Sequence, residues 1–218
     1  MNGLKEMKLR NGHQLNHSLP VAPLSINHDL LTENEKINLI EEKFRDIMLI
    51  LGLDLKDDSL KDSPRRVAKM YVKEVFSGLS PENEPEITLF DNKYKYSEML
   101  VEKDIPVYSY CEHHFVPIIG KCHIAYISTG KVIGLSKLNR IVHYFSKRPQ
   151  VQERLTVQIA EYLKEVLGTE DVAVLMDAEH LCVASRGVRD TGSSTFTSSY
   201  HGKFHEKETR NELLMILK

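Results

Sequence analysis

Apolar residues recur at helical spacing soon after the start of the chain. Thr32 and Glu35 have the spacing of a capping box, in which two residues bond to each other's backbone N–H groups. The apolar positions that follow lie on one face of a helix, namely Ile37, Ile40, Phe44, Ile47 and Leu51. Gly52 is placed to end this helix. The pattern therefore predicts a first helix from Thr32 to about Gly52.

A second helical pattern begins near Ser63. Pro64 occupies the first turn, where its missing N–H group costs no hydrogen bond, and Gly78 is placed to close the helix. The predicted buried face consists of Val67, Met70, Tyr71 and Val75. The segment 80–86 contains two prolines and three glutamates, and we interpret it as a connector.

Beyond Ile87 the pattern changes to short strands and further helices. Strands are predicted at 118–127, 132–133, 171–177, 180–188 and 195–200, and helices at 136–146, 151–167 and from about Glu208. Gly168 is a plausible C-cap of the longest of these helices. The order of elements predicts an α+β fold, with an antiparallel sheet and helices packed on one face.

The chain divides into three parts on this reading. Residues 1–30 are polar, contain two prolines and show no sustained period, so we expect a mobile N-terminal tail. Residues 31–80 form an N-terminal helical segment, and residues 81–218 form the main domain.

Composition and charge exclude several classes of function. The 218 residues carry 29 basic against 31 acidic side chains, a balance that creates no overall field for nucleic acid or an anionic membrane. No apolar run approaches the roughly 20 residues that span a bilayer, and no signal-type segment opens the chain. The three cysteines are a poor disulfide framework, so we expect a cytoplasmic protein whose thiols serve a metal or chemistry.

The strongest chemical signal is the run Cys111-Glu112-His113-His114. A thiolate and an imidazole three residues apart favour zinc, and Cys182 is the best candidate for a third ligand. If 180–188 is a strand, His180 and Cys182 project to the same face. Three protein ligands leave a fourth position for water, as in catalytic sites, whereas His180 as a fourth ligand would make a structural site. Cys122 is interpreted as a buried core residue.

Basic residues near these motifs suggest a polyanionic ligand. Arg65, Arg66 and Lys69 open the second helix, where cations oppose the helix dipole, and this placement suggests phosphate binding. Each side chain alone is better explained as solvated, whereas for the cluster the two explanations are equal. Further cations follow at Lys137, Arg140, Arg186 and Arg189. Together they would suit a triphosphate.

Gln152 and Glu153 open the helix predicted at 151–167. A carboxylate such as that of Glu153 can accept two N–H bonds from a guanine edge. The helix dipole alone also favours an acidic residue at this position, so both explanations stay open.

Five blocks of the sequence together resemble GTP cyclohydrolase I, from about Ile37 to the C-terminus. The blocks are Asp57–Leu60 with Ser63–Tyr71, Cys111–Phe115, Val132–Arg140, Arg148–Leu155 and His180–Asp190. The departures are mild: Tyr110 stands where a small polar residue is common, and Cys122 belongs to no family motif. Five blocks in family order and spacing make the resemblance specific.

The resemblance implies the tunnelling fold for the catalytic domain at 81–218, in which sheets of several subunits close into a barrel. It also implies a homodecamer of two pentamers with active sites at subunit interfaces. The implied reaction is the zinc-dependent opening of the guanine imidazole ring of GTP. That reaction releases formate and forms 7,8-dihydroneopterin triphosphate, at the start of a pterin or folate-type pathway.

The resemblance also implies a role for each candidate residue. Cys111, His114 and Cys182 would bind Zn²⁺, and His113 and His180 would be the acid/base pair. Gln152 and Glu153 would hold the guanine, and Ser136 would lie against the ribose. The triphosphate would be held by Lys137, Arg140 and Arg186, with Arg66 and Lys69 of a neighbouring subunit. Two rivals are a deazapurine nitrile reductase of the same fold and a non-catalytic nucleotide-binding protein with structural zinc.

Overall fold

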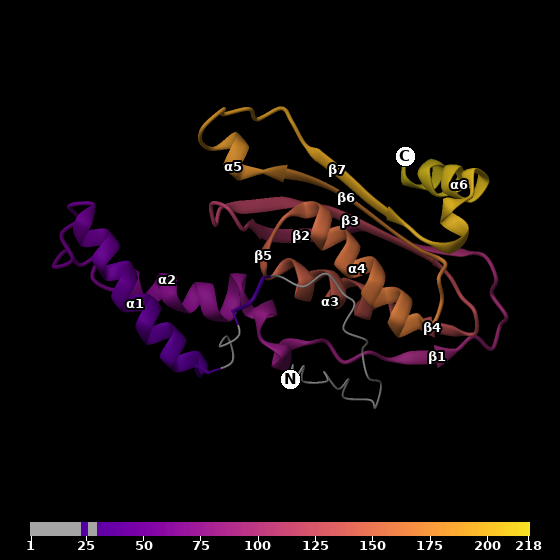
Figure 1. Cartoon of the computed structure of the whole chain (residues 1–218), viewed down its shortest axis with the longest axis horizontal. Coiled ribbons are helices and arrows are strands. Elements are labelled where there is room, and N and C mark those ends of the chain that lie inside the picture. The colour runs from indigo at the N-terminus through magenta and orange to yellow at the C-terminus, as the bar shows by residue number, and fades with distance from the viewer. Residues whose placement is uncertain (1–22, 26–29) are drawn as a thin grey trace.

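A computed structural model of the chain describes residues 23–25 and 30–218, and a five-stranded sheet lies at its centre (Figure 1). The strand order is β5-β2-β3-β6-β7, with only β5 and β2 parallel. The strands are β2 (Met99–Cys111), β3 (Pro117–Ile127), β5 (Pro149–Gln150), β6 (Val172–His180) and β7 (Thr195–Tyr200). A separate antiparallel pair is formed by β1 (Leu89–Asp91) and β4 (Lys131–Ile133). This arrangement has the α+β architecture that the sequence predicts.

Helices α3 (Leu135–Ser146) and α4 (Gln152–Leu167) cover one face of the sheet. Side chains alternate between the two faces along β6, and Val174 and Met176 point into the main core under these helices. Cys122 of β3 lies in the same core, and its complete burial raises the pKa of its thiol. The opposite face carries Leu175, against which the C-terminal helix α6 (Lys207–Leu217) packs. The prediction placed helices on one face only, whereas α6 also covers the other face; the larger core lies under α3 and α4.

The N-terminal helices α1 (Glu33–Ile50) and α2 (Ser63–Met70) lie side by side beyond one end of the sheet (Figure 1). The predicted capping box is confirmed, because Glu35 N–H donates to Thr32 Oγ1 at 3.3 Å and Thr32 N–H donates to Glu35 Oε2 at 2.8 Å. Gly52 follows the helix with a φ of 82°, which glycine adopts without strain. The first helix therefore begins and ends as predicted.

The second helix departs from the prediction after Met70. The backbone forms a π-helical turn at Tyr71–Val75 and 3₁₀ turns at Ser77–Leu79 and Pro81–Asn83. Gly78 does not cap an α-helix; its N–H group donates to Lys147 O at 2.9 Å, and an added Cβ atom would lie 2.1 Å from Tyr144 O. Gly78 is needed because two backbone segments meet there, which a local helix signal does not reveal.

Two strand assignments also differ. The prediction of a strand at 180–188 is wrong, because β6 ends at His180 and Leu181–Ala184 form the one-turn helix α5. His180 pairs with Ile118, and the next position on β3 is Pro117, which has no N–H group to continue the ladder. Strand β2 was not predicted, because a bulge at Lys103–Asp104 interrupts its alternating pattern.

The expected mobile tail at 1–30 lies almost wholly outside the described residues. Within the described part of the chain, no helix combines the length and the apolar composition needed to cross a membrane.

Candidate metal and nucleotide site

The Cys111–Phe115 segment forms a tight turn between β2 and β3, which we call the metal turn. Cys111 N–H donates to Val116 O at 2.9 Å and Phe115 N–H donates to Cys111 O at 2.8 Å. The turn places Cys111 Sγ 3.6 Å from His113 Nδ1 and 4.0 Å from His114 Nδ1. The thiol of Cys111 is buried, whereas both histidines are exposed.

Helix α5 brings Cys182 to this turn. The ligand atoms of Cys111, His114 and Cys182 all lie within 4.8 Å of one another. Two sulfur atoms and one imidazole nitrogen are a donor set that suits zinc. Burial, followed by the neighbouring Cys111 thiol, raises the pKa of Cys182, so an adjacent cation is needed to hold its sulfur as a thiolate. The residues therefore fit a zinc ion, although the ligand comes from a helical turn and not from the predicted strand.

His180 lies beside this group but outside it. The group of possible ligands found in the described residues contains three donors and not His180. The His180 Nε2 atom is instead 2.8 Å from Gln152 Oε1. Burial lowers the pKa of His180, and the nearby carboxylate of Glu153 opposes this shift. This arrangement favours an open three-ligand site over a closed four-ligand one.

The Gln152 side chain is buried and fully bonded within the protein. Its amide nitrogen donates to the backbone oxygens of Met176 at 3.1 Å and Thr195 at 2.8 Å, and to Thr197 Oγ1 at 3.1 Å. Its oxygen is therefore the remaining acceptor, and His180 Nε2 must carry the donated proton. The next residue, Glu153, is exposed in the first turn of α4.

Aromatic rings brace the metal turn from the side of the N-terminal helices. The ring of Phe115 lies 5.2 Å from that of Phe76 and 6.4 Å from that of Tyr71. Tyr110, at the end of β2, adds a ring contact to Phe76 at 5.6 Å. The π-helical turn and the metal turn are therefore packed as one unit.

Two residues with no assigned role join the metal turn to α4. Glu112 and Arg154 form an ion pair in which both side chains are largely buried. The sequence analysis did not predict this contact, although Glu112 lies inside the Cys-Glu-His-His motif. Residues 42 positions apart meet here because β5 pairs with the end of β2.

The structure does not bring Ser136, Lys137 and Arg140 to the metal turn of the same chain. These residues lie in the first half of α3, which follows directly after β4, at the far end of the sheet (Figure 1). The opposite end of α3 leads into β5, which pairs with Cys111. Since α3 has 12 residues, its two ends are separated by about 18 Å.

Arg66 and Lys69 are exposed on α2, and Arg186 is exposed just beyond the end of α5. Arg66 Nη2 lies 3.8 Å from Asp62 on α2, and Lys69 follows one turn later. Arg186 follows α5, and its positive charge lowers the pKa of Cys182, against the larger effect of burial. Arg186 is therefore a member of the predicted triphosphate set that lies near a metal-ligand candidate of this chain.

Comparison with known proteins decides the family. The sequence profile of GTP cyclohydrolase I matches residues 40–218. The chain belongs to the GTP cyclohydrolase I family. It is 59% identical over 188 residues to the GTP cyclohydrolase 1 of Flavobacterium johnsoniae, covering 86% of this chain and 84% of that protein. It is 55% identical over 180 residues to the enzyme of that name from Yersinia enterocolitica, covering 82% of each chain.

A relative from Aeromonas hydrophila, also named GTP cyclohydrolase 1, is 53% identical over 189 residues and is covered over 87% of its length. The match to the GTP cyclohydrolase I family begins inside α1 and runs to the last residue, so it includes every candidate site residue named above. Membership agrees with the curled sheet and the flanking helices of the tunnelling fold.

Proposed function

We propose that this protein opens the imidazole ring of GTP by zinc-dependent hydrolysis, releasing formate and forming 7,8-dihydroneopterin triphosphate. This is the first step of a pterin or folate-type pathway. The observation that carries the proposal is the three-donor group of Cys111, His114 and Cys182 beside His113 and His180. The names of the relatives, GTP cyclohydrolase 1, supply the substrate.

Cys111, His114 and Cys182 would hold the zinc ion. Bound zinc supplies Lewis acidity that lowers the pKa of a water molecule in an open coordination position toward about 7. The exposure of His114 leaves access to the group from solvent, as hydrolysis requires. This access would let the guanine ring approach with carbon eight toward the metal ligands.

His180 would protonate the ring nitrogen next to carbon eight. Because Nε2–H is bonded to Gln152, the Nδ1 atom is the one left to face a substrate. With Nε2–H bonded to Gln152, His180 would donate from Nδ1 only in its protonated form, so the ring would first take up a proton there; its lowered pKa makes that proton easy to give up. The ring would open to a formamide, and a second hydrolysis would release formate. His113, which extends from the same turn as the proposed metal ligands, and Ser136 would manage proton transfers on the sugar as the ribose chain rearranges and closes the pterin ring.

Glu153 would hold the guanine edge. Guanine presents two N–H donors there that adenine lacks, so an adenine nucleotide would leave the carboxylate without a partner. Such a loss is worth about 10⁴-fold in discrimination. We assign Gln152 to the same guanine region, where its buried side chain supports His180.

The triphosphate would be held by basic residues of more than one subunit. Arg186 would come from the chain that supplies the metal ligands, and Arg66 and Lys69 from a neighbour. The position of Lys137 and Arg140 at the far end of α3 supports their coming from another subunit as well. Ser136, beside them, would contact the ribose of that same site.

A homo-oligomer, a decamer of two pentamers, is the assembly that we propose for these shared sites. The strand β7 lies at one edge of the sheet and β2 is nearly free at the other, because β5 covers only its last two residues. Open edges of this kind can pair with the sheet of a second copy. We place the enzyme in the cytoplasm, since all three of its cysteines are free thiols.

The test is formate release from GTP by the zinc-loaded protein, measured together with zinc content and the appearance of a fluorescent pterin. We expect activity with GTP and none with ATP. Glu153→Gln should weaken the use of GTP with zinc content unchanged, and His180→Ala should keep zinc and stop turnover. A zinc-loaded protein that releases no formate would reject the proposal, and would favour a nucleotide-binding protein with structural zinc. Reduction of a nitrile by NADPH would indicate the reductase.

A further inference from the structure

The ion pair between Glu112 and Arg154 is the best-anchored charged contact near the metal turn. Arg154 Nη2 bonds Glu112 Oε2 and also donates to Pro149 O at 3.1 Å, while Arg154 Nε donates to Gln150 Oε1 at 3.0 Å. The side chains of Arg154 and Glu112 are 17% and 24% exposed. Arg154 is thus held at three points, unlike a freely moving surface cation.

The pair connects the two halves of the proposed site. Glu112 stands between Cys111 and His113, and Arg154 follows Glu153 in the first turn of α4. The backbone repeats the link, because Glu112 N–H donates to Gln150 O at 3.0 Å. A shift of Arg154 would therefore move the metal turn relative to the carboxylate proposed to hold guanine.

The carboxylate of Glu112 is not placed to act as a ligand or a proton carrier. It is absent from the possible metal ligands found in the described residues, and Arg154 occupies one of its oxygens. A largely buried ion pair adds little net stability, since desolvation offsets most of the attraction. Its value at this position must come from geometry.

We propose that Glu112 and Arg154 are positioning residues that fix the metal ligands Cys111 and His114 relative to Glu153. The inference rests on the proposed function for its link to catalysis. Its link to metal retention stands independently, because partners that orient a ligand-bearing segment change metal affinity or activity by about 10–100-fold when they are removed.

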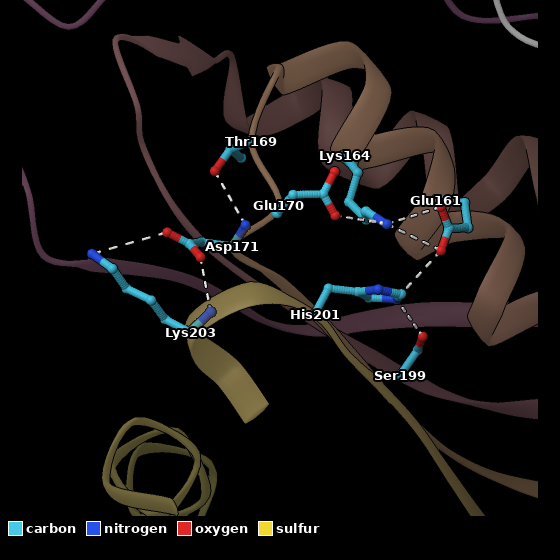
Figure 2. A network of polar contacts seen from close by, with 8 residues as sticks. All are labelled: Glu161, Lys164, Thr169, Glu170, Asp171, Ser199, His201 and Lys203. Carbon is cyan, nitrogen blue, oxygen red and sulfur yellow. Dashed lines mark hydrogen bonds and ion pairs between the residues drawn. The ribbon is translucent and has the colours of Figure 1, made fainter. Parts of the chain in front are cut away.

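The test compares Glu112→Gln, Arg154→Met and the double variant with the unchanged protein. Two quantities are measured on the zinc-loaded oligomer: the rate of zinc loss to a chelator, and kcat and KM for GTP. The matched control is Lys164→Met. Lys164 lies on the same helix with its side chain 16% exposed, and pairs with Glu161 at 3.1 Å and Glu170 at 3.0 Å (Figure 2). It is ten residues beyond Arg154, or about 15 Å along the helix.

Each single variant should lose zinc about tenfold faster and lower kcat by about 10–100-fold. KM should stay within about threefold, because Glu153 and the phosphate contacts remain. The double variant should lose zinc no faster, and have a kcat no lower, than Arg154→Met, since both substitutions break the same ion pair. The control should lose zinc at the original rate.

Three results would overturn the inference. The first is that Glu112→Gln loses zinc at a rate within twofold of that of the unchanged protein. The second is that the double variant shows the product of the two single-variant effects on the rate of zinc loss and on kcat. The third is equally fast zinc loss from Lys164→Met, which would indicate general loosening of the fold. If the unchanged protein releases no formate from GTP, the proposed function fails, and the zinc-loss rates alone decide whether the pair positions the turn.

Discussion

Replacing Gln152 by methionine separates a supporting role from direct substrate binding. Methionine has a similar length and fills the same space, so the change removes polar contacts without leaving a large cavity. The two amide hydrogens, shared among Met176 O, Thr195 O and Thr197 Oγ1, and the oxygen that accepts from His180 Nε2 are lost, which amounts to three full hydrogen bonds. Each is worth about 1 kcal/mol net, which gives a destabilisation of about 3 kcal/mol.

The expected change in thermal midpoint follows from this free energy. For a chain of 150–250 residues, 1 kcal/mol lowers the midpoint by about 2–4 °C, so Gln152→Met should melt about 6–12 °C lower. Differential scanning fluorimetry of the zinc-loaded protein measures this shift, and steady-state kinetics with GTP measure KM. The released His180 ring should also lower kcat, with KM changed little.

The neighbouring residue provides the control. Glu153→Gln alters an exposed side chain, so it should leave the thermal midpoint unchanged and weaken GTP use. The reasoning is refuted if Gln152→Met melts at the original temperature while its KM for GTP rises. That result would mean that the Gln152 side chain leaves its buried partners to contact guanine.

Three further predictions follow from the described contacts. Cys182→Ser should reduce bound zinc well below one ion per chain by elemental analysis, since two donors hold zinc poorly; full occupancy would remove Cys182 from the ligand set. Gly78→Ala should lower the free energy of unfolding by about 3 kcal/mol, because the new Cβ would lie 2.1 Å from Tyr144 O; unchanged stability in denaturant titration would show that the segment shifts freely. Burial lowers the pKa of His201 below its ordinary 6.5, so the unfolded chain binds more protons and stability should fall as pH drops below about 6.5; His201→Gln should flatten that decline in melts from pH 7 to 5, and an unchanged slope would contradict it.

Local signals in the sequence are enough to find the elements that local chemistry controls. The capping box at Thr32 and the left-handed Gly168 after α4 are both seen as predicted. Strand β2 was missed because Asp104 adopts a φ of 57° inside a bulge, which breaks the two-residue period. The end of β6 at His180 depends on Pro117 of another strand, so no local pattern could reveal it.

The candidate site also contains residues that local sequence predicts and residues that it does not. The grouping of Cys111, His114 and Cys182 as possible metal ligands was predictable from residue type, because few arrangements of cysteine and histidine have another explanation. The supporting contacts were not, since they depend on segments distant in the sequence. Gln152 reaches residues 24 to 45 positions away, and Arg154 meets Glu112 across 42 positions. Such contacts follow from the pairing of β5 with β2 and of β6 with β7.

The placement of Lys137 at the far end of α3 from the metal turn has a genetic consequence. If each site draws its thiols from one chain and its α3 cations from another, two inactive alleles can rescue each other. Chains carrying Cys182→Ser and chains carrying Lys137→Ala, co-expressed in one cell, would assemble some sites in which both contributions are intact. Each allele alone would leave the cell without pterin, whereas the pair would restore part of the supply.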